Sequence, residues 1–185
     1  QKTTTRLLHQ SAYLYIQIQD FDKAVFALEK AYTKSGRFSP RLIMDLAVLY
    51  SLISQRKKGL EMVNLPDEKI HQFPPLAMLK GYLLSQVGRY EAALMALDLI
   101  KEEAKSSLKE IQSKTENLNL SPLLYRYDFS YKGYLIQRGL LTQATGEPQI
   151  AQKIFRETML IAPEDHQIKN ALIGACVAAM DFDQA

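Results

Sequence analysis

The sequence predicts an all-α solenoid built from repeated helical hairpins. Two sets of small residues support this prediction. Successive members of the first set lie 35 and 34 residues apart, and again 34 apart at the end of the chain: Ala24, Gly59, Ala93, then Ala151 and Ala185. A second small residue stands 12 positions before each of the first four: Ala12, Ala47, Gly81 and Gly139. Apolar residues also recur at helical spacing on both sides of a short break, so each unit is expected to pair two closely crossing helices.

Composition and charge exclude several classes of protein. Of the 185 residues, 47% are hydrophobic, and 23 basic against 20 acidic residues give a net charge of +3. The densest basic run is only Arg56, Lys57 and Lys58, so nucleic acid is not expected as a partner. No apolar run reaches the roughly 18 residues of a membrane span, and we expect none in this sequence. The single cysteine, Cys176, excludes an internal disulfide.

No pattern of residues points to catalysis. His9, His71 and His166 are far apart in the sequence, and no ligand stands at useful spacing from them. The sequence has no glycine-rich phosphate loop and no nucleophile motif. Adjacent carboxylates such as Glu102–Glu103 lie in polar surroundings, where solvated charge is the favoured interpretation over acid/base catalysis. We therefore expect no enzyme, no cofactor and no bound metal.

The repeats are expected to follow one another along a single array. Glycine in "VGRY" and "TGEP" is expected to end a first helix, and Pro148 suits the first turn of the next. The second unit keeps little beyond Ala47, Tyr50 and Gly59. The expected units are repeat one at about 5–38, a degenerate repeat two at about 40–73, repeat three at about 74–107, an inserted extension at about 108–131, repeat four at about 132–165 and a truncated fifth repeat at 166–185.

The insertion lies between the third and fourth repeats. Ala93 and Ala151 are 58 residues apart, which is one period of 34 plus 24 residues. Apolar residues continue every three or four positions after Ala93, which favours a second helix that runs on to about Thr115. Ser121 and Pro122 are typical of a helix start, so an elongated antiparallel helix pair is expected. A disordered segment is the alternative.

These units resemble the tetratricopeptide repeat, in a divergent form of bacterial type. The first copy is close to the family pattern except for its missing proline: Leu8, Ala12, Tyr15, Phe21, Ala24, Leu28, Ala31 and Gly36. The third copy keeps Gly81, Gly88 and Tyr90, and the fourth keeps Phe155 and Pro163. The resemblance implies a right-handed solenoid whose stacked first helices line a concave inner face. In this family that face commonly receives an extended or helical peptide of a partner protein.

The resemblance also implies which side chains line the inner face. They are His9, Tyr13 and Ile16 from the first copy, Met44 and Val48 from the second, and Met78 and Tyr82 from the third. The alternative for Tyr13 and Tyr82 is packing between neighbouring repeats. Some family members grip a carboxylate with a clamp of Lys, Asn and Arg. The matching sites here hold no such clamp, which favours an apolar groove that takes a hydrophobic peptide: His9, Tyr13, Arg41, Met78 and Tyr82.

The insertion supplies a second candidate surface. Tyr127, Tyr131 and Tyr134 are spaced four and three residues apart, so one helix would carry them on a single stripe. Aromatic side chains offer a large apolar area with a polar tip, which suits contact with a partner. The alternative is that these tyrosines pack between the two elongated helices.

These observations predict a non-catalytic scaffold for protein–protein interaction. By analogy, its setting is a bacterial secretion, pilus or envelope assembly system, in a chaperone-like role. The alternatives are the regulatory or targeting region of a larger enzyme and a structural solenoid that associates with itself. The chain begins at Gln1 and ends where a helix should open, so we expect a fragment. We expect a cytoplasmic location, with the periplasm as the alternative.

Overall fold

The computed structural model describes residues 2–36, 38–108, 121 and 123–182. Every regular element in this part of the chain is helical, and residues 104–108 add a further helical turn. The helices are α1 (Lys2–Gln17), α2 (Phe21–Ser35), α3 (Pro40–Leu52), α4 (Arg56–Val63), α5 (Asp67–Gln72), α6 (Pro75–Ser85), α7 (Tyr90–Asp98), α9 (Tyr131–Ala144), α10 (Pro148–Ile161) and α11 (His166–Phe182).

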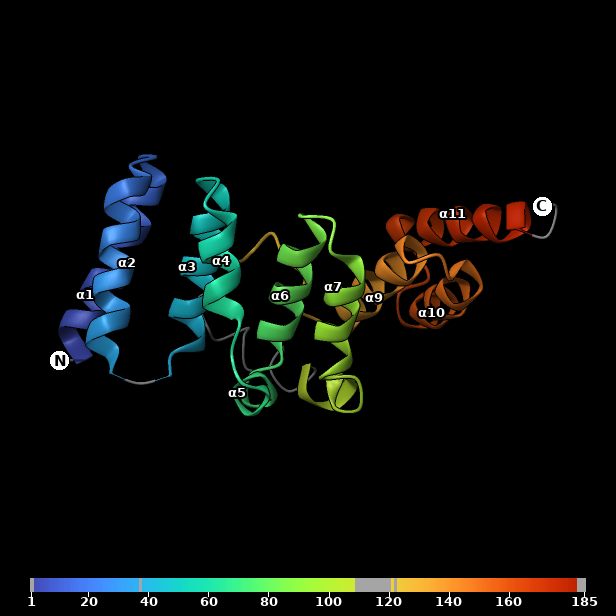
Figure 1. Ribbon diagram of the computed structural model, residues 1–185, viewed down its shortest axis with the longest axis horizontal. Helices are drawn as coiled ribbons and strands as arrows, with labels where there is room; N and C mark the ends of the chain where they lie inside the picture. The colour runs from blue at the N-terminus through green and yellow to red at the C-terminus, as the bar shows by residue number, and fades with distance from the viewer. Residues whose placement is uncertain (1, 37, 109–120, 122, 183–185) are drawn as a thin grey trace.

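The helices pair into hairpins that follow one another in a row (Figure 1). The hairpins α1–α2, α3–α4 and α6–α7 stand side by side, and α9, α10 and α11 follow with their axes turned relative to the first three hairpins. The described ends of the chain lie at opposite ends of the array. This arrangement confirms the prediction of an all-α solenoid of helical hairpins.

The predicted breaks between helices lie where glycine changes the direction of the backbone. Gly88 has φ 74°, and Gly146 has φ 88°, a conformation that costs glycine little because it lacks a Cβ atom. Pro148 then occupies the first turn of α10, where its missing N–H removes no helical hydrogen bond. Asp20 caps α2, since its Oδ1 accepts a hydrogen bond of 3.2 Å from the backbone N–H of Lys23.

The recurring small residues lie where paired helices cross most closely. A Cβ atom added to Gly59 of α4 would stand 2.7 Å from the backbone oxygen of Ala47 in α3. A Cβ atom added to Gly139 of α9 would stand 2.5 Å from the ring of Phe155 in α10. Five alanines at these positions are fully buried: Ala12, Ala24, Ala47, Ala93 and Ala151. The small residues that recur about every 34 positions therefore lie at the points of closest contact between helices.

The predicted extension of the third repeat is wrong in the part that the structure describes. Helix α7 ends at Asp98, and turns occupy residues 99–103. Ile100, Ala104 and Leu108 are completely buried against the core beside α6 and α9. These side chains reach the core from a turn and a short helical segment, so packing against other repeats overrides the helical spacing of the sequence here. Residues 109–120, on which the rest of the extension falls, lie outside the described residues.

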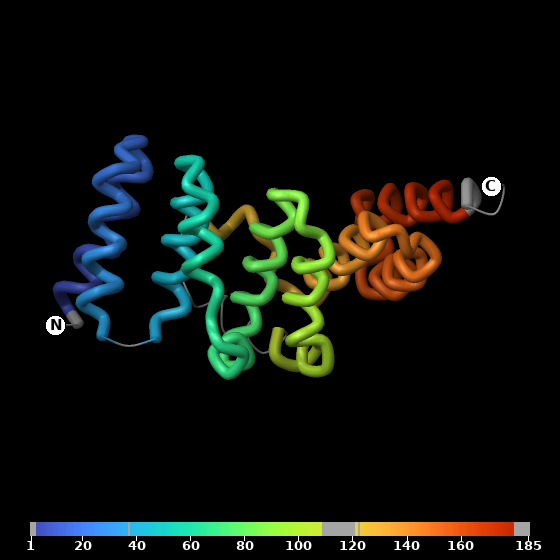
Figure 2. Tube along the Cα trace, in the orientation of Figure 1, coloured from blue at the N-terminus to red at the C-terminus, as the bar shows by residue number. Residues whose placement is uncertain are grey.

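The second half of the predicted helix pair is also wrong. Residues 123–130 form turns and irregular chain, and α9 begins at Tyr131 rather than near Ser121. We call residue 121 together with residues 123–130 the inner strap. Figure 2 shows this segment passing behind α4 and α6, on the side of the array that carries α3. Leu123 and Leu124 join the core cluster of the first three hairpins, which accounts for the irregular path.

The glycine contacts lead to a test of helix packing. We expect Gly59→Ala to lower the free energy of unfolding by about 1 to 3 kcal/mol, because the new methyl group meets backbone rather than a movable side chain. Gly174→Ala in α11 is the matched control, since the nearest atom to its added Cβ is 3.8 Å away. The free energy of unfolding of the control should rise by up to about 1 kcal/mol, because alanine has a higher helix propensity than glycine. Urea unfolding followed by circular dichroism measures both, and equal effects would contradict the close crossing.

Candidate partner-binding site

The inner strap covers the face that the first helices of the array would otherwise expose. Ser121 is completely buried, and Leu123 and Leu124 are 3% and 1% exposed. These leucines pack in one cluster with apolar side chains of α1, α3 and α6. As a consequence, α3 is buried along residues 42–50 without interruption.

Three of the seven residues predicted to line an open groove are therefore core residues. Met44 is 2% exposed, while Val48 and Met78 are completely buried. Ile16 is half-buried and packs against the same core cluster. The strap supplies the contacts that a bound peptide was expected to make, so the expectation of an open apolar groove is not met.

His9 and Tyr13 meet around a carboxylate that sequence reasoning missed. Asp45 of α3 is completely buried. Its Oδ2 lies 2.7 Å from Nε2 of His9 and accepts a hydrogen bond of 2.8 Å from the hydroxyl of Tyr13. The Tyr13 oxygen also lies 2.7 Å from Nε2 of His9. This network joins α1 to α3 across the first two hairpins.

The Tyr13 hydroxyl keeps its proton under ordinary conditions. Burial raises the pKa of Tyr13, and the charge of Asp45 beside it raises this pKa further. Ser121 of the strap acts in the opposite direction and lowers this pKa. The lone aspartate within "LIMDLAV" is the signal in the sequence that could have revealed the network.

Tyr82 and Tyr127 form the aromatic contact between α6 and the strap. Their ring centroids are 5.3 Å apart, and Tyr127 stacks in turn on Phe129 at 5.9 Å. Such tilted and stacked ring pairs contribute about 0.5 to 1.5 kcal/mol beyond the burial of their area. Burial raises the pKa of Tyr127, while Arg126 and Gln86 beside it lower this pKa. Tyr82 and Tyr127 are both half-buried, and each keeps part of its ring at the surface.

The three tyrosines predicted on one helical stripe do not share an element. Tyr127 belongs to the strap, whereas Tyr131 and Tyr134 belong to α9. The hydroxyl of Tyr131 donates a hydrogen bond of 3.1 Å to Glu157 of α10. Tyr134 is 2% exposed and lies in the core. The expected surface formed by these three residues is therefore absent, because the helix starts only at Tyr131.

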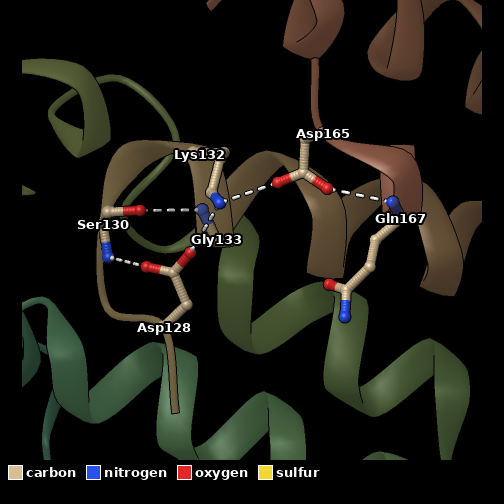
Figure 3. Close-up of polar contacts among 6 residues, drawn as sticks. All are labelled: Asp128, Ser130, Lys132, Gly133, Asp165 and Gln167. Atoms are coloured by element: carbon tan, nitrogen blue, oxygen red, sulfur yellow. Dashed lines mark hydrogen bonds and ion pairs between the residues drawn. The ribbon is translucent and has the colours of Figure 1, made fainter. Parts of the chain in front are cut away.

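A polar network turns the strap into α9 and ties it to the last hairpin (Figure 3). Asp128 Oδ1 accepts a hydrogen bond of 3.0 Å from the backbone N–H of Ser130, and Ser130 Oγ accepts one of 3.1 Å from Gly133. Lys132 lies 2.9 Å from Asp165 and 3.7 Å from Asp128. These contacts cap the helix and set where the strap leaves the inner face.

One opening remains on the inner face, and we call it the inner cleft. It has a volume of about 470 Å³ and lies between the ends of α3 and α6 beside the strap. Ser51 donates a hydrogen bond of 3.2 Å to Gln86 within it. Its lining comes from α3, the turn after it, the start of α4, the end of α6 and the strap: Val48, Ser51, Leu52, Ser54, Arg56, Tyr82, Gln86, Arg126 and Tyr127. Only Val48, Tyr82 and Tyr127 of this set were predicted site residues.

A second opening, the outer cleft, lies between α4, α6 and α7. It has a volume of about 540 Å³ and mixes apolar side chains with both signs of charge. Met95, which is 70% exposed, is its most prominent apolar group. Within the described part of the chain, no group of three His, Cys, Asp or Glu side chains could hold a metal ion. No described helix is long and apolar enough to cross a membrane.

Comparisons with known proteins agree with this architecture. Residues 5–33 match the family model of the tetratricopeptide repeat. No curated protein sequence matches the chain. A crystal structure of MamA is 16% identical with a TM-score of 0.67, and covers 100% of this chain and 87% of its own. The structure of MamA AMB-1 is 13% identical with a TM-score of 0.66, over 96% of this chain and 90% of its own.

A third solved structure extends the comparison beyond MamA. A putative kinesin light chain with TPR-like repeats from Podospora anserina is 16% identical with a TM-score of 0.64, over 97% of this chain and 88% of its own. At these identities the likeness concerns the fold. The protein is thus a solenoid of tetratricopeptide-like helical hairpins. Its first hairpin matches the tetratricopeptide repeat model, and the array as a whole shares the fold of these solved structures.

The position of the strap can be tested with two neighbouring residues. Leu124→Ala should lower the free energy of unfolding by about 2 to 5 kcal/mol, because it removes a buried leucine from the inner face. Tyr125→Ala is the control on the same segment, since Tyr125 is 71% exposed, and its effect should stay within about 0.5 kcal/mol. Chemical denaturation measures both values. A Leu124 effect as small as the Tyr125 effect would mean that the strap does not pack on the inner face.

The tyrosine contacts also predict a dependence on alkaline pH. Burial raises the pKa of Tyr82 from 10.0 to about 12, with the charge of Asp128 adding to the shift. The unfolded chain therefore loses this proton before the folded chain does, so stability falls as pH rises from about 10 towards about 12. Tyr82→Phe removes the titrating group and should reduce this slope. Denaturation at a series of alkaline pH values compares the two proteins, and identical slopes would contradict the burial of the hydroxyl.

Proposed function

We propose that this chain is a non-catalytic scaffold that binds a segment of another protein at the inner cleft. The observation that supports the proposal is that the strap fills most of the inner face yet leaves this one opening beside it. The opening exposes apolar, aromatic and hydrogen-bonding side chains together, as in Leu52, Tyr82 and Gln86. A peptide segment needs such a mixture, because its side chains seek apolar contact while its backbone seeks hydrogen-bond partners.

The proposed setting is a bacterial secretion, pilus or envelope assembly system, with the scaffold in the cytoplasm. Irregular arrays of helical hairpins serve such systems, and the degenerate second unit makes this array irregular. This part of the proposal rests on the resemblance alone, since the likeness to MamA concerns the fold. The identity of a captured partner would test it directly.

The experiment compares two substitutions that place the same charge at the two clefts. Leu52, which is 44% exposed, lines the inner cleft, and Met95, which is 70% exposed, lines the outer cleft. The immobilised protein captures partners from a lysate of its source organism, and mass spectrometry identifies and quantifies them. We expect Leu52→Glu to reduce capture at least about tenfold, while Met95→Glu keeps it within about twofold.

Each other outcome carries a distinct meaning. Equal capture by wild type and Leu52→Glu would contradict binding at the inner cleft, and loss with Met95→Glu alone would move the site to the outer cleft. Unchanged helical circular dichroism excludes loss of fold in either variant. Light scattering at rising protein concentration measures the mass of the protein in solution. Mass that grows with concentration would favour the second candidate, self-association through the exposed Leu7 and Leu14 of α1 and Ile18 directly after it.

A further inference from the structure

Positively charged side chains gather around the inner cleft from two separate elements. Arg56, the first residue of α4, and Arg126 of the strap both line it. A smaller cleft of about 430 Å³ adjoins it through Arg56 and is lined by Lys57 and Lys58 as well. None of the residues that line either cleft is acidic. The two clefts therefore form one continuous surface with positive charge.

No carboxylate pairs with the cations that line the two clefts, among the residues that the structure describes. Arg56, Lys57 and Arg126 form no ion pair with any residue that the structure describes, and Lys58 lies 5.5 Å from the ring centroid of Tyr50. Other basic side chains do meet carboxylates, in the pairs Lys23–Asp20, Lys132–Asp165, Arg138–Asp98 and Lys169–Glu164. Unpaired cations close together repel one another, so an anionic group between them would relieve that repulsion.

Apolar and hydrogen-bonding groups stand directly beside these cations. Tyr82 and Tyr127 form an aromatic wall, and Leu52 remains 44% exposed next to it. The negative charge of Asp128 acts on Tyr82 and raises its pKa. This carboxylate already has a basic neighbour, since Lys132 lies 3.7 Å from it. The cleft thus combines guanidinium groups, which bind carboxylates in bidentate geometry, with a surface for one large apolar side chain.

We propose that the partner segment bound at the inner cleft is acidic, with carboxylates held by Arg56 and Arg126 and an adjacent apolar or aromatic side chain placed against Tyr82 and Tyr127. This inference rests on the proposed function, because it names the chemistry of the segment that the scaffold takes. It replaces the hydrophobic peptide expected from the sequence, since the strap already occupies the apolar part of the inner face. A nucleic acid is disfavoured, because the cations fill a short cleft rather than an extended stripe and the net charge is only +3.

The test uses fluorescent probes of defined chemistry with the whole chain. The acidic probe is a short glutamate-rich peptide with a central phenylalanine, and its control carries glutamine in place of every glutamate. The protein variant is Arg56→Glu/Arg126→Glu. Its matched control, Lys34→Glu/Lys153→Glu, has the same net charge and changes two exposed lysines outside both clefts. Fluorescence anisotropy at several salt concentrations gives the dissociation constants.

We expect the acidic probe to bind the wild-type protein at least about tenfold tighter than the glutamine probe, with affinity that falls as salt rises. The affinity for the acidic probe should fall at least about tenfold in the arginine double variant and at most about threefold in the lysine double variant. The arginine double variant should also gain affinity for a lysine-rich version of the peptide. That gain requires a folded cleft, so it excludes unfolding as the cause of the loss.

Several outcomes would overturn the inference. Equal loss in the two double variants would show that overall charge, rather than the cleft, holds the probe. Absence of binding by the acidic probe would refute the acidic class, and tighter binding of single-stranded oligothymidylate at the same salt concentration would favour nucleic acid. If the glutamine probe binds equally well while partner capture still depends on Leu52, the proposed function stands and the acidic class is wrong.

Discussion

The burial of Leu123 and Leu124 against the first helices is the contact on which the other features of this array depend. In a regular solenoid the first helices keep one face for solvent or ligand, and that face carries polar residues. Here the strap covers it, which explains why α3 is buried along residues 42–50. The same cover encloses Asp45, whose carboxylate needs the hydrogen bonds of Tyr13 and His9 to be tolerated in the core.

The strap also decides where the surface can interact. Because it fills the apolar part of the inner face, the remaining cleft is polar and positively charged, and two of its walls, Arg126 and Tyr127, come from the strap itself. The proposed binding surface is thus made by an insertion laid on the repeats, rather than by the repeats alone. The capping of α9 by Ser130 and the ion pair of Lys132 fix the point where this insertion ends.

The sequence predicts the hairpins well because their determinants are local. Small residues at a fixed interval mark the helix crossings, and glycine or proline marks the breaks, as at Gly88 and Pro148. The insertion is predicted poorly because its determinants are distant. Ile100 and Leu124 follow patterns that suit a straight helix, yet their positions are decided by core surfaces contributed from other repeats. Which part of the inner face stays open could not be predicted, since it depends on that same long-range packing.

Contacts between the strap and the first hairpins also bear on how the array folds. Repeat proteins usually depend on contacts between neighbours, so terminal repeats can open while the others stay folded. Here Leu124 packs in one cluster with side chains of α1 and α3, and Tyr127 packs on Tyr82, so residues far apart in the sequence hold the first three hairpins together. Such non-local closure slows folding and couples distant units, because the first hairpin cannot fray without uncovering the strap. The array therefore gains the cooperativity of a globular domain at its amino-terminal end.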